Sequence, residues 1–339
     1  MNRVSLNPGV KMVKVPDDRA GQRLDNFLLG QLKGAPRSLI YKIIRDGQVR
    51  INGKRAKPDS RLEVEDEVRI PPVKIDQADP DRVPPKSMLE RLAACIVFED
   101  KALLVLNKPS GIATHGGSGV SFGVIEALRA LRPNEPLELV HRLDRDTSGV
   151  LVVAKKRSAL LQLQALMRGD DEEEGPEKQY LALLVGKMPS GTMTVNAPLQ
   201  KSVIRGGERM VRVDPAGKAS TSHFTLLERR GGHSFCKIRI ETGRTHQIRV
   251  HMAHIGHGII GDPNYGRAMR AGQMPDNALR DTLAFVRAFP RQALHASHLG
   301  FDHPVTGAAM AFDTPLPTDM ANVIQGLEER ITNRGKMKP

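Results

Sequence analysis

Residues 140–155 constrain the fold of this chain most, because a charged decapeptide runs directly into a strand-forming segment. Residues 150–153 read Val-Leu-Val-Val, and this short apolar run, rich in β-branched side chains, is typical of a buried strand. The polar half therefore lies on the turn that feeds the strand, where a rigid sheet can position groups for chemistry. The first functional candidates are His141, Arg142 and Asp144.

Two interpretations of this stretch involve no catalysis. Asp144, Asp146 and Ser148 followed by Gly149 imitate the opening of a calcium loop, but its twelfth position, which requires a bidentate Glu, is Lys155. The spacing therefore disfavours calcium. Taken alone, the stretch also fits a surface turn whose polar side chains bond their own backbone.

The same stretch resembles the signature of the RluA-type pseudouridine synthases, in which the first Asp of His-Arg-Leu-Asp is the catalytic carboxylate. That residue is Asp144 here. The resemblance continues through Lys178-x-Tyr180 and through residues 242–252, Thr-Gly-Arg-Thr-His-Gln-Ile-Arg-Val-His-Met, whose second Arg, Arg249, matches the family's active-site arginine. It implies isomerisation of uridine to pseudouridine in large-subunit (23S) ribosomal RNA, without a metal or an organic cofactor.

The implied reaction suits these residue types. It breaks the N1–C1′ bond of uridine and joins C1′ to C5, and because uracil leaves as a stabilised anion, one ionised carboxylate can suffice where glycosidases use two. The sequence leaves two alternatives for Asp144, which are attack at C1′ and attack at a neighbouring position of the ribose. Arg249 would keep this carboxylate charged in a dry pocket, and Arg142 would fill the stack vacated by a flipped nucleotide. Tyr180 would pack on the base and help to remove the C5 proton, although a strand tyrosine taken alone more often serves packing.

Composition indicates the kind of partner. The chain carries 51 Lys and Arg against 38 Asp and Glu, a net charge of +13, so a polyanion such as ribosomal RNA is expected. Two cysteines allow one disulfide at most and favour a reducing compartment, and the sequence has no apolar run long enough to span a membrane. We therefore expect a cytoplasmic protein that binds no membrane, and nothing in the sequence requires more than a monomer.

Residues 15–70 read as a small RNA-binding domain. Apolar spacing predicts two helices, near residues 23–29 and 38–44, and Asn52-Gly53 predicts a hairpin with a type I′ turn before a strand at 67–70. A helix and an adjoining hairpin that are basic together favour an RNA surface over a merely solvated face. The order of elements resembles the S4 domain, which would recognise structured RNA by shape and backbone. The candidate contacts are Arg37, Lys42, Arg45, Lys54 and Arg55.

Beyond this domain the sequence predicts three further parts. Five prolines in residues 71–92 predict a stiff, extended linker. Residues 93–325 would form the catalytic domain, an α+β fold with a mixed, mainly antiparallel sheet flanked by helices. A final helix is expected after Asp319, and it would run out into a basic tail, residues 326–339, that is mobile over residues 333–339. The expected helices lie at 124–131 and 158–167, and the expected strands at 95–98, 103–108, 150–153, 180–185, 221–227 and 234–240.

Three polar segments remain open to more than one interpretation. His115 opens a Gly-rich loop, residues 115–119, whose backbone could approach a phosphate. Histidines in and after residues 242–252 suggest zinc, but no cysteine is near and carboxylates are scarce before Asp262, which favours a helix surface near RNA with some residues buried. Six carboxylates within residues 169–177 lack metal-ligand spacing and indicate a solvated loop.

Two other functions stay open on sequence grounds. The chain could be a non-catalytic ribosome-binding or assembly factor built on its S4-like domain, or a synthase of the same family acting on a different RNA. The set of Asp144, Tyr180 and Arg249 argues against the first. Motifs alone do not decide the second, because target choice depends on the shape recognised by both domains.

Overall fold

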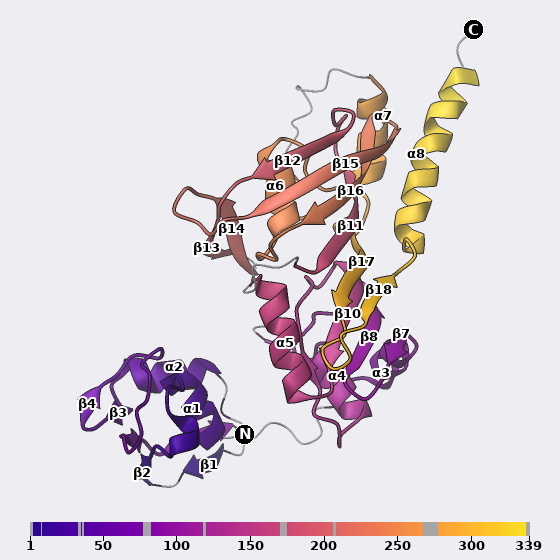
Figure 1. Ribbon diagram of the computed structural model, residues 1–339. Helices are drawn as coiled ribbons and strands as arrows, with labels where there is room; N and C mark the ends of the chain where they lie inside the picture. Colours follow the sequence, from indigo (N-terminus) through magenta and orange to yellow (C-terminus); the bar gives the residue numbers. More distant parts are fainter. Residues whose placement is uncertain are drawn as a thin grey trace. The chain divides into compact units, whose positions relative to one another are not determined.

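The computed structural model describes residues 3–7, 9–32, 35, 37–76, 83–117, 120–169, 175–205, 208–266 and 277–336. The chain divides into two compact units, Met1–Val83 and Pro84–Pro339 (Figure 1). Each has an apolar core of its own. Within the described ranges, no helix is both long and apolar enough to cross a membrane.

The first unit packs two helices on a small antiparallel sheet. Leu24, Leu28 and Ile40 of the helices share a core with Val68 and Ile70 of the sheet. The strand order is β2-β5-β3-β4. Its elements are β2 (Lys11–Lys14), the 3-10 turn η1 (Asp17–Arg19), α1 (Leu24–Gln31), α2 (Arg37–Arg45), β3 (Arg50–Ile51), β4 (Lys54–Arg55) and β5 (Glu67–Ile70).

The predicted turn between β3 and β4 is present. Asn52 and Gly53 have φ angles of 48° and 74°, and positive φ at both central residues defines the type I′ turn. The Asn52 side chain supports the turn by donating to Asp66 at 2.7 Å and accepting the Glu67 backbone N–H at 2.8 Å. The two helices and the strand at 67–70 also appear where the sequence predicts them.

The structure differs from the predicted linker at residues 71–92. Val73–Asp76 is a strand, β6, that pairs with β1 (Arg3–Asn7), and Lys86–Ala93 is a helix, α3, with Pro85 as its N-cap. Pro71 and Pro72 stand just before β6, and Pro84 and Pro85 just before α3, where a missing N–H costs no hydrogen bond. Leu92 of α3 is fully buried, so this end of the segment is packed, whereas residues 77–82 of the predicted linker lie outside the described part of the chain.

The second unit is built on a ten-stranded mixed sheet, which confirms the predicted fold class. Only the β10–β17 pair is parallel among the described ladders. The main path runs through β12 (Thr192–Asn196), β15 (Thr221–Arg230), β16 (His233–Ile240), β11 (Glu177–Leu184), β17 (Leu294–Asp302), β10 (Ser148–Ala154), β8 (Leu103–Lys108) and β7 (Ile96–Glu99). At its sides β9 (Glu138–Leu139) pairs with β10 and β18 (Ala309–Asp313) with β17, while β13 (Leu199–Arg205) and β14 (Glu208–Val213) form a separate hairpin.

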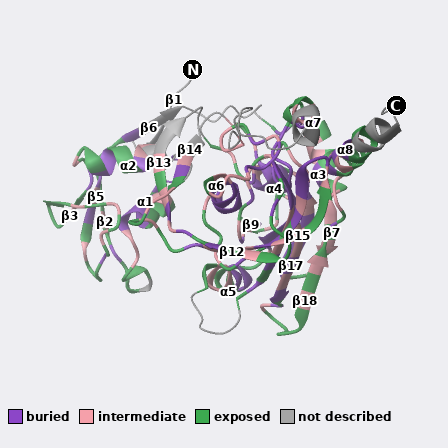
Figure 2. Ribbon diagram, turned by 90° about the horizontal axis from the view of Figure 1, so that it is seen from above, coloured by how far each residue is buried: buried purple, intermediate pink, exposed green. Residues whose placement is uncertain are grey.

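Helices cover both faces of the central strands. Leu104 and Leu106 of β8 pack with α3 and α4, whereas Leu103 and Val105 pack with α5, as the two-residue period of a strand requires. Every residue of β10 is consequently buried, and Figure 2 shows α4 and α6 as buried elements too. The remaining helices are α4 (Val124–Leu131), α5 (Arg157–Arg168), α6 (Gln247–His254), α7 (Asn277–Arg287) and α8 (Thr318–Lys336).

The final helix predicted after Asp319 is present, and it continues through most of the basic tail predicted at residues 326–339. Helix α8 continues to Lys336, and Leu327 within it is fully buried against the core that α7 and the sheet share. Burial of apolar positions such as Leu327 therefore keeps the chain helical beyond the start of the basic segment at residue 326. Residues 337–339 lie outside the described part of the chain.

Candidate active site

A buried lysine fixes the polar loop before β10. The Lys108 ammonium donates to three backbone carbonyls, those of Pro109 at 2.9 Å, Ile112 at 2.8 Å and Arg145 at 3.0 Å. The Gly111 backbone N–H also donates to the Arg145 carbonyl at 3.0 Å. Burial lowers the pKa of Lys108 to about 7. The loop is therefore fixed to the segment after β8 and not left to solvent.

The loop ends where β10 approaches β17 closely. A Cβ on Gly149, whose φ is +114°, would lie 2.0 Å from the Ala296 carbonyl oxygen, so only glycine fits. Just before Gly149, the Ser148 hydroxyl bonds the His295 ring at 2.9 Å, and Gln292 donates to the Thr147 hydroxyl at 3.0 Å. These contacts fix the direction in which the preceding residues face.

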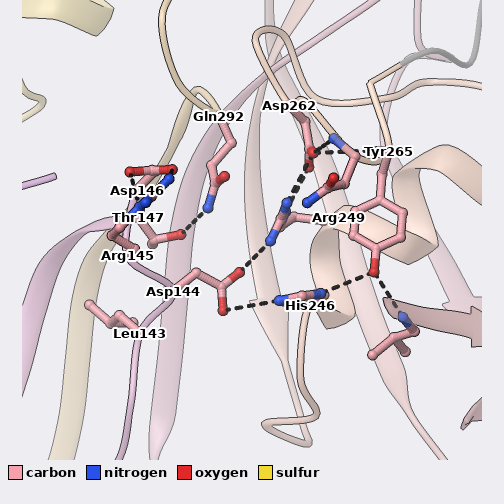
Figure 3. Close-up of polar contacts among 12 residues, drawn as sticks. Leu143, Asp144, Arg145, Asp146, Thr147, His246, Arg249, Asp262, Tyr265 and Gln292 are labelled. Carbon is pink, nitrogen blue, oxygen red and sulfur yellow. Dashed lines mark hydrogen bonds and ion pairs between the residues drawn. The ribbon is translucent and has the colours of Figure 1, made fainter. Parts of the chain in front are cut away.

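Asp144 projects from this loop towards a buried arginine of α6. Arg249 Nη1 donates to Asp144 Oδ2 at 2.9 Å, while its Nε and Nη2 donate to Asp262 Oδ2 and Oδ1 at 2.6 and 3.0 Å (Figure 3). The side chains of Arg249 and Asp262 are 2% and 0% exposed, but that of Asp144 is 18% exposed. Of the two carboxylates that Arg249 contacts, Asp144 is thus the one that a ligand can reach.

The charges of this network stabilise one another. Burial by itself lowers the pKa of Arg249, but the hydrogen bonds and charge of Asp262, together with the charge of Asp144, raise it overall. The guanidinium carbon also lies 5.0 Å from the centre of the Tyr265 ring, a favourable cation–π distance. Arg249 therefore stays cationic and supplies the permanent positive charge beside Asp144.

A second chain of contacts reaches Asp144 through His246. His246 Nε2 lies 3.9 Å from Asp144 Oδ1, and its Nδ1 lies 3.0 Å from the Tyr265 hydroxyl. Since that hydroxyl accepts the Val211 backbone N–H at 2.9 Å, it can give its own proton to Nδ1, which leaves the ring proton on Nε2, facing Asp144. His246 caps α6 at a φ of 53°, a strained conformation for a residue with a side chain.

Tyr180 faces the same pocket from β11. Burial, and then the charge of Asp144, raises the pKa of Tyr180, so its side chain stays a neutral phenol. The structure thus brings Asp144, Tyr180 and Arg249 together, as the sequence predicts, while their catalytic roles stay a prediction. The pocket is lined by Arg142, Leu143, Asp144, Thr147, Tyr180, Ile240, Gly243, Arg244, His246, Gln247, Ile248, Arg249 and Leu294.

The three candidate RNA contacts of this unit differ in their surroundings. Arg142 is exposed at the pocket, and it has no ion pair within the described part of the chain. His141 is engaged internally, since its Nε2 accepts the Val152 backbone N–H at 3.1 Å, and burial lowers its pKa to about 4. His115 is exposed, with its Nδ1 2.7 Å from the Gly116 carbonyl. Residues 118–119 of its loop and 170–174 of the acidic loop lie outside the described residues.

The basic candidates of the first unit form a surface of exposed side chains. Lys42 and Arg45 on α2 and Lys54 and Arg55 at the hairpin are all exposed. A Cβ on Gly47, just after α2, would lie 2.7 Å from Nε of Arg55, so the hairpin arginine reaches the end of the helix. The side chain of Arg37 lies outside the described residues. Lys42, Arg45, Lys54 and Arg55 are called the basic surface below.

Three residues of the site were not predicted from the sequence. Asp262 was considered only as a distant zinc ligand, although Gly-Asp-Pro-Asn-Tyr at residues 261–265 was a visible signal for a rigid turn. His246 was considered only as one of four histidines in the zinc hypothesis, and Lys108 carried no distinguishing signal. Of the other histidines after β16, His251 is buried and bonds Ser222 and the Ala197 carbonyl, so it is not on a helix surface near RNA. The described residues include no group of three metal-ligating side chains.

Comparison with known proteins agrees with this geometry. Residues 102–254 match the family model described as RNA pseudouridylate synthase, and residues 22–68 match the S4 domain. The ribosomal large subunit pseudouridine synthase C of Salmonella typhimurium is 49% identical over 94% of this chain and 97% of its own. That of Pasteurella multocida is 47% identical over 96% of each chain.

Among solved structures, human RNA pseudouridylate synthase domain containing 4 is similar with 26% identity and a TM-score of 0.56, over 71% of this chain and 95% of its own. Human RNA pseudouridylate synthase domain containing 1 shares the fold, with 24% identity and a TM-score of 0.52, over 76% of this chain and 99% of its own. From its identity to the bacterial enzymes over nearly its full length, this chain belongs to the RluA-type family of RNA pseudouridine synthases.

Proposed function

We propose that this synthase converts uridines of large-subunit (23S) ribosomal RNA to pseudouridine, with Asp144 as the group that engages the ribose. The relatives at 47–49% identity are named ribosomal large subunit pseudouridine synthase C, and the net charge of +13 suits a large polyanion. Because the isomerisation gains and loses no atom and transfers no electrons to a second molecule, it requires no cofactor. We propose that the chain works as a cytoplasmic monomer.

One observation carries the proposal. The Asp144 carboxylate is paired with an arginine that a second, fully buried carboxylate holds in place, and yet it remains open to the pocket. A carboxylate needs a nearby permanent cation to stay ionised in a site from which RNA excludes water. The geometry therefore supplies a charged, oriented and reachable oxygen, which is what bond cleavage at the ribose demands.

The reaction balances with the groups in this pocket. The N1–C1′ bond breaks and its electron pair leaves on uracil, while Asp144 stabilises or bonds the electron-poor sugar. Uracil turns, C5 forms the new bond to C1′, and the proton lost from C5 is replaced by one gained at N1. Because Tyr180 is a neutral phenol, it can accept the C5 proton only if it passes its own proton on in the same step. Its ring is suited to hold the base during the turn.

Two further assignments concern access to the target. Arg142 is exposed at the pocket and has no ion pair to the residues that the structure describes, so it is placed to fill the space that a flipped nucleotide leaves in its stack. The basic surface of the first unit is suited to bind structured RNA through its phosphates. Target choice would then combine docking by the first unit with base capture by the second.

The decisive experiment replaces Asp144 by the amide of the same shape. With a ribosomal RNA transcript labelled with tritium at C5 of uridine, Asp144→Asn should release tritium at least about 10⁴-fold more slowly, while its RNA affinity changes less than about threefold. Asp146→Asn, on the same loop, is the matched control and should retain normal turnover. Normal turnover by Asp144→Asn would refute the assignment, and faster release from transfer RNA than from large-subunit RNA would refute the substrate.

A further inference from the structure

Arg249 anchors Asp144 through one of its two carboxylate oxygens. Its Nη1 donates to Oδ2 at 2.9 Å. This single bond sets the plane of the carboxylate only loosely, because the side-chain torsion that turns an Asp carboxylate has broad minima. Within the part of the chain that the structure describes, no hydrogen bond reaches Oδ1. The direction in which Oδ1 faces the pocket therefore depends on a second group.

His246 stands beside Oδ1 and is held there. Its Nε2 lies 3.9 Å from Oδ1 of Asp144, and its side chain is 6% exposed (Figure 3). This separation exceeds an ordinary hydrogen bond by about 1 Å, and hydrogen bonds of catalytic groups commonly shorten when the substrate is bound. A small movement of the carboxylate or of the ring is enough to close the contact.

The hydroxyl of Tyr265 determines which ring nitrogen carries the proton. It lies 3.0 Å from Nδ1 of His246 and accepts the Val211 backbone N–H at 2.9 Å. Since the contact with Val211 uses a lone pair, the phenol proton is available for Nδ1. Burial raises the pKa of Tyr265, so the phenol keeps that proton. A neutral imidazole that accepts at Nδ1 has its own proton on Nε2, and this N–H faces Oδ1.

One turn places both groups that face Asp144. The Tyr265 ring lies edge-on to the His246 ring, with centroids 5.6 Å apart, and 5.0 Å from the guanidinium carbon of Arg249. The Tyr265 backbone N–H donates to Asp262 Oδ1 at 3.0 Å. Asp262 also holds Arg249. Residues 262–265 therefore position the arginine at one oxygen of Asp144 and the histidine at the other.

A merely structural role does not account for His246. It is the N-cap of α6, but its side chain makes no capping hydrogen bond to the helix. Its φ of 53° lies in the left-handed region, which glycine or asparagine adopts at lower cost. The contacts of the ring must offset this strain, and strain of this kind is concentrated at functional sites. With its proton on Nε2, the ring acts as a donor and is not a base for the C5 proton.

We propose that His246 is a positioning residue for the isomerisation, and that its Nε2–H, set by Tyr265, holds Oδ1 of Asp144 towards the ribose. The proposal rests on the proposed function, because Asp144 is the carboxylate which that function places at the ribose. A carboxylate oxygen has two lone pairs, so one can accept from Nε2 while the other remains for the sugar. With a donor on each oxygen, the carboxylate keeps one orientation while the N1–C1′ bond breaks.

The test measures tritium release by the full chain across a range of transcript concentrations, which separates turnover from KM. His246→Leu removes the donor and should lower kcat about 10²-fold, with KM within about twofold of normal. His246→Gln places an amide N–H near the position of Nε2 and should restore kcat to at least about a third of normal. His254→Gln, at an exposed histidine of the same helix, is the matched control and should leave both quantities unchanged.

The role of Tyr265 is tested in two backgrounds. Tyr265→Phe keeps the ring but loses the hydroxyl that fixes the His246 proton, so kcat should fall about tenfold. In the His246→Gln background the same change should cost less than about twofold, because an amide has no tautomer to set. An equal loss in both backgrounds would mean that Tyr265 acts through Val211, and it would overturn the proposal.

Two other outcomes would also overturn the proposal. One is a His246→Gln variant as slow as His246→Leu, since a donor at that position would then not suffice. The other is a raised KM with normal kcat in His246→Leu, which would place the ring on the RNA and not on Asp144. Failure of the proposed function would look different, because the wild type itself would then release no tritium from large-subunit RNA.

Discussion

The two units of this enzyme use positive charge in opposite ways. In the active site one arginine, Arg249, is buried between two carboxylates. Its three side-chain hydrogen bonds are donated to carboxylate oxygens of Asp144 and Asp262. In the first unit the basic surface consists of exposed side chains on a helix and a hairpin, with no ion pair to a carboxylate within the described residues. The buried arginine anchors the Asp144 carboxylate, and the basic surface supplies a high density of positive charge towards RNA.

This difference predicts how each unit responds to substitution. A buried network fails as a whole, because removing one member leaves the others desolvated without partners. An exposed surface loses its contacts one at a time, since each lysine contributes a similar, salt-screened attraction to phosphate. Three experiments test this contrast, and they follow in order of the expected effect.

The largest effect is expected from Arg249→Gln. The change leaves Asp144 and Asp262 facing each other without the cation, so turnover should fall at least about 10³-fold and the second unit should lose about 3–5 kcal/mol of unfolding free energy. Two of the three tyrosines, Tyr180 and Tyr265, lie beside the network. Their near-ultraviolet circular dichroism during urea unfolding reports this unit.

Arg212→Gln is the matched control for Arg249→Gln. Its guanidinium lies 2.8 Å from Asp214, as close as Arg249 lies to Asp144, but the Arg212 side chain is 63% exposed. Surface ion pairs contribute less than about 1 kcal/mol, so this variant should unfold almost as the wild type does. Equal losses for the two arginines would show that burial does not set the difference.

A graded effect is expected from the basic surface. Replacing Lys42, Arg45, Lys54 and Arg55 together by Gln should lower affinity for the ribosomal transcript about 10²-fold at physiological salt, whereas each single change should cost only about threefold. Turnover at saturating RNA should stay within about twofold of normal, because the site is untouched. Filter binding across a salt series, with tritium release measured in parallel, gives both quantities.

The graded pattern would be contradicted by a single substitution that removes all binding, which would mean that one residue reads a specific group. It would also be contradicted by a quadruple variant with normal affinity. In that case the first unit would contact RNA through another face, or the second unit would supply nearly all of the affinity.

The same contrast explains what could be predicted from sequence. Local patterns identified the type I′ turn at Asn52-Gly53, the strand at residues 150–153 and the helix at 124–131, because each depends on the residues within it. The basic surface was visible for a similar reason, since its charge is dense along the chain. The two ends of the segment at 71–92 were misread, because prolines at the entrances of β6 and α3 look the same in sequence as prolines in an extended linker.

The active site was predictable only in part. Asp144, Tyr180 and Arg249 stand in motifs that the family resemblance marks as functional, but it assigned no role to Asp262, the partner that holds Arg249. Asp262 lies 13 residues from Arg249, in a turn well beyond the end of α6 at His254, and its role depends on the fold that brings this turn back to the helix. Likewise, nothing local distinguishes the buried Lys108 from an exposed lysine, because its three acceptors are carbonyls that any residue supplies.

Lys108 gives the smallest expected effect, and it depends on pH. The pKa of Lys108 is lowered to about 7 in the folded chain, against an ordinary value of 10.5. Between these values the unfolded chain holds a proton that the folded chain has released, so the free energy of unfolding rises with pH, by at most about 1.4 kcal/mol per unit. Lys108→Met should abolish this contribution, and the stability of the wild type relative to the variant should increase from pH 7 to pH 9.

Urea unfolding of the wild type and Lys108→Met at pH 6, 7, 8 and 9 tests this prediction. The difference between the two curves isolates one group, because every other titrating residue is common to both. The exposed Lys237→Met should run parallel to the wild type at all four values. If Lys108→Met does so too, the three carbonyls hold the ammonium charged throughout this range, and Lys108 belongs with Arg249 as a permanent buried cation of the site.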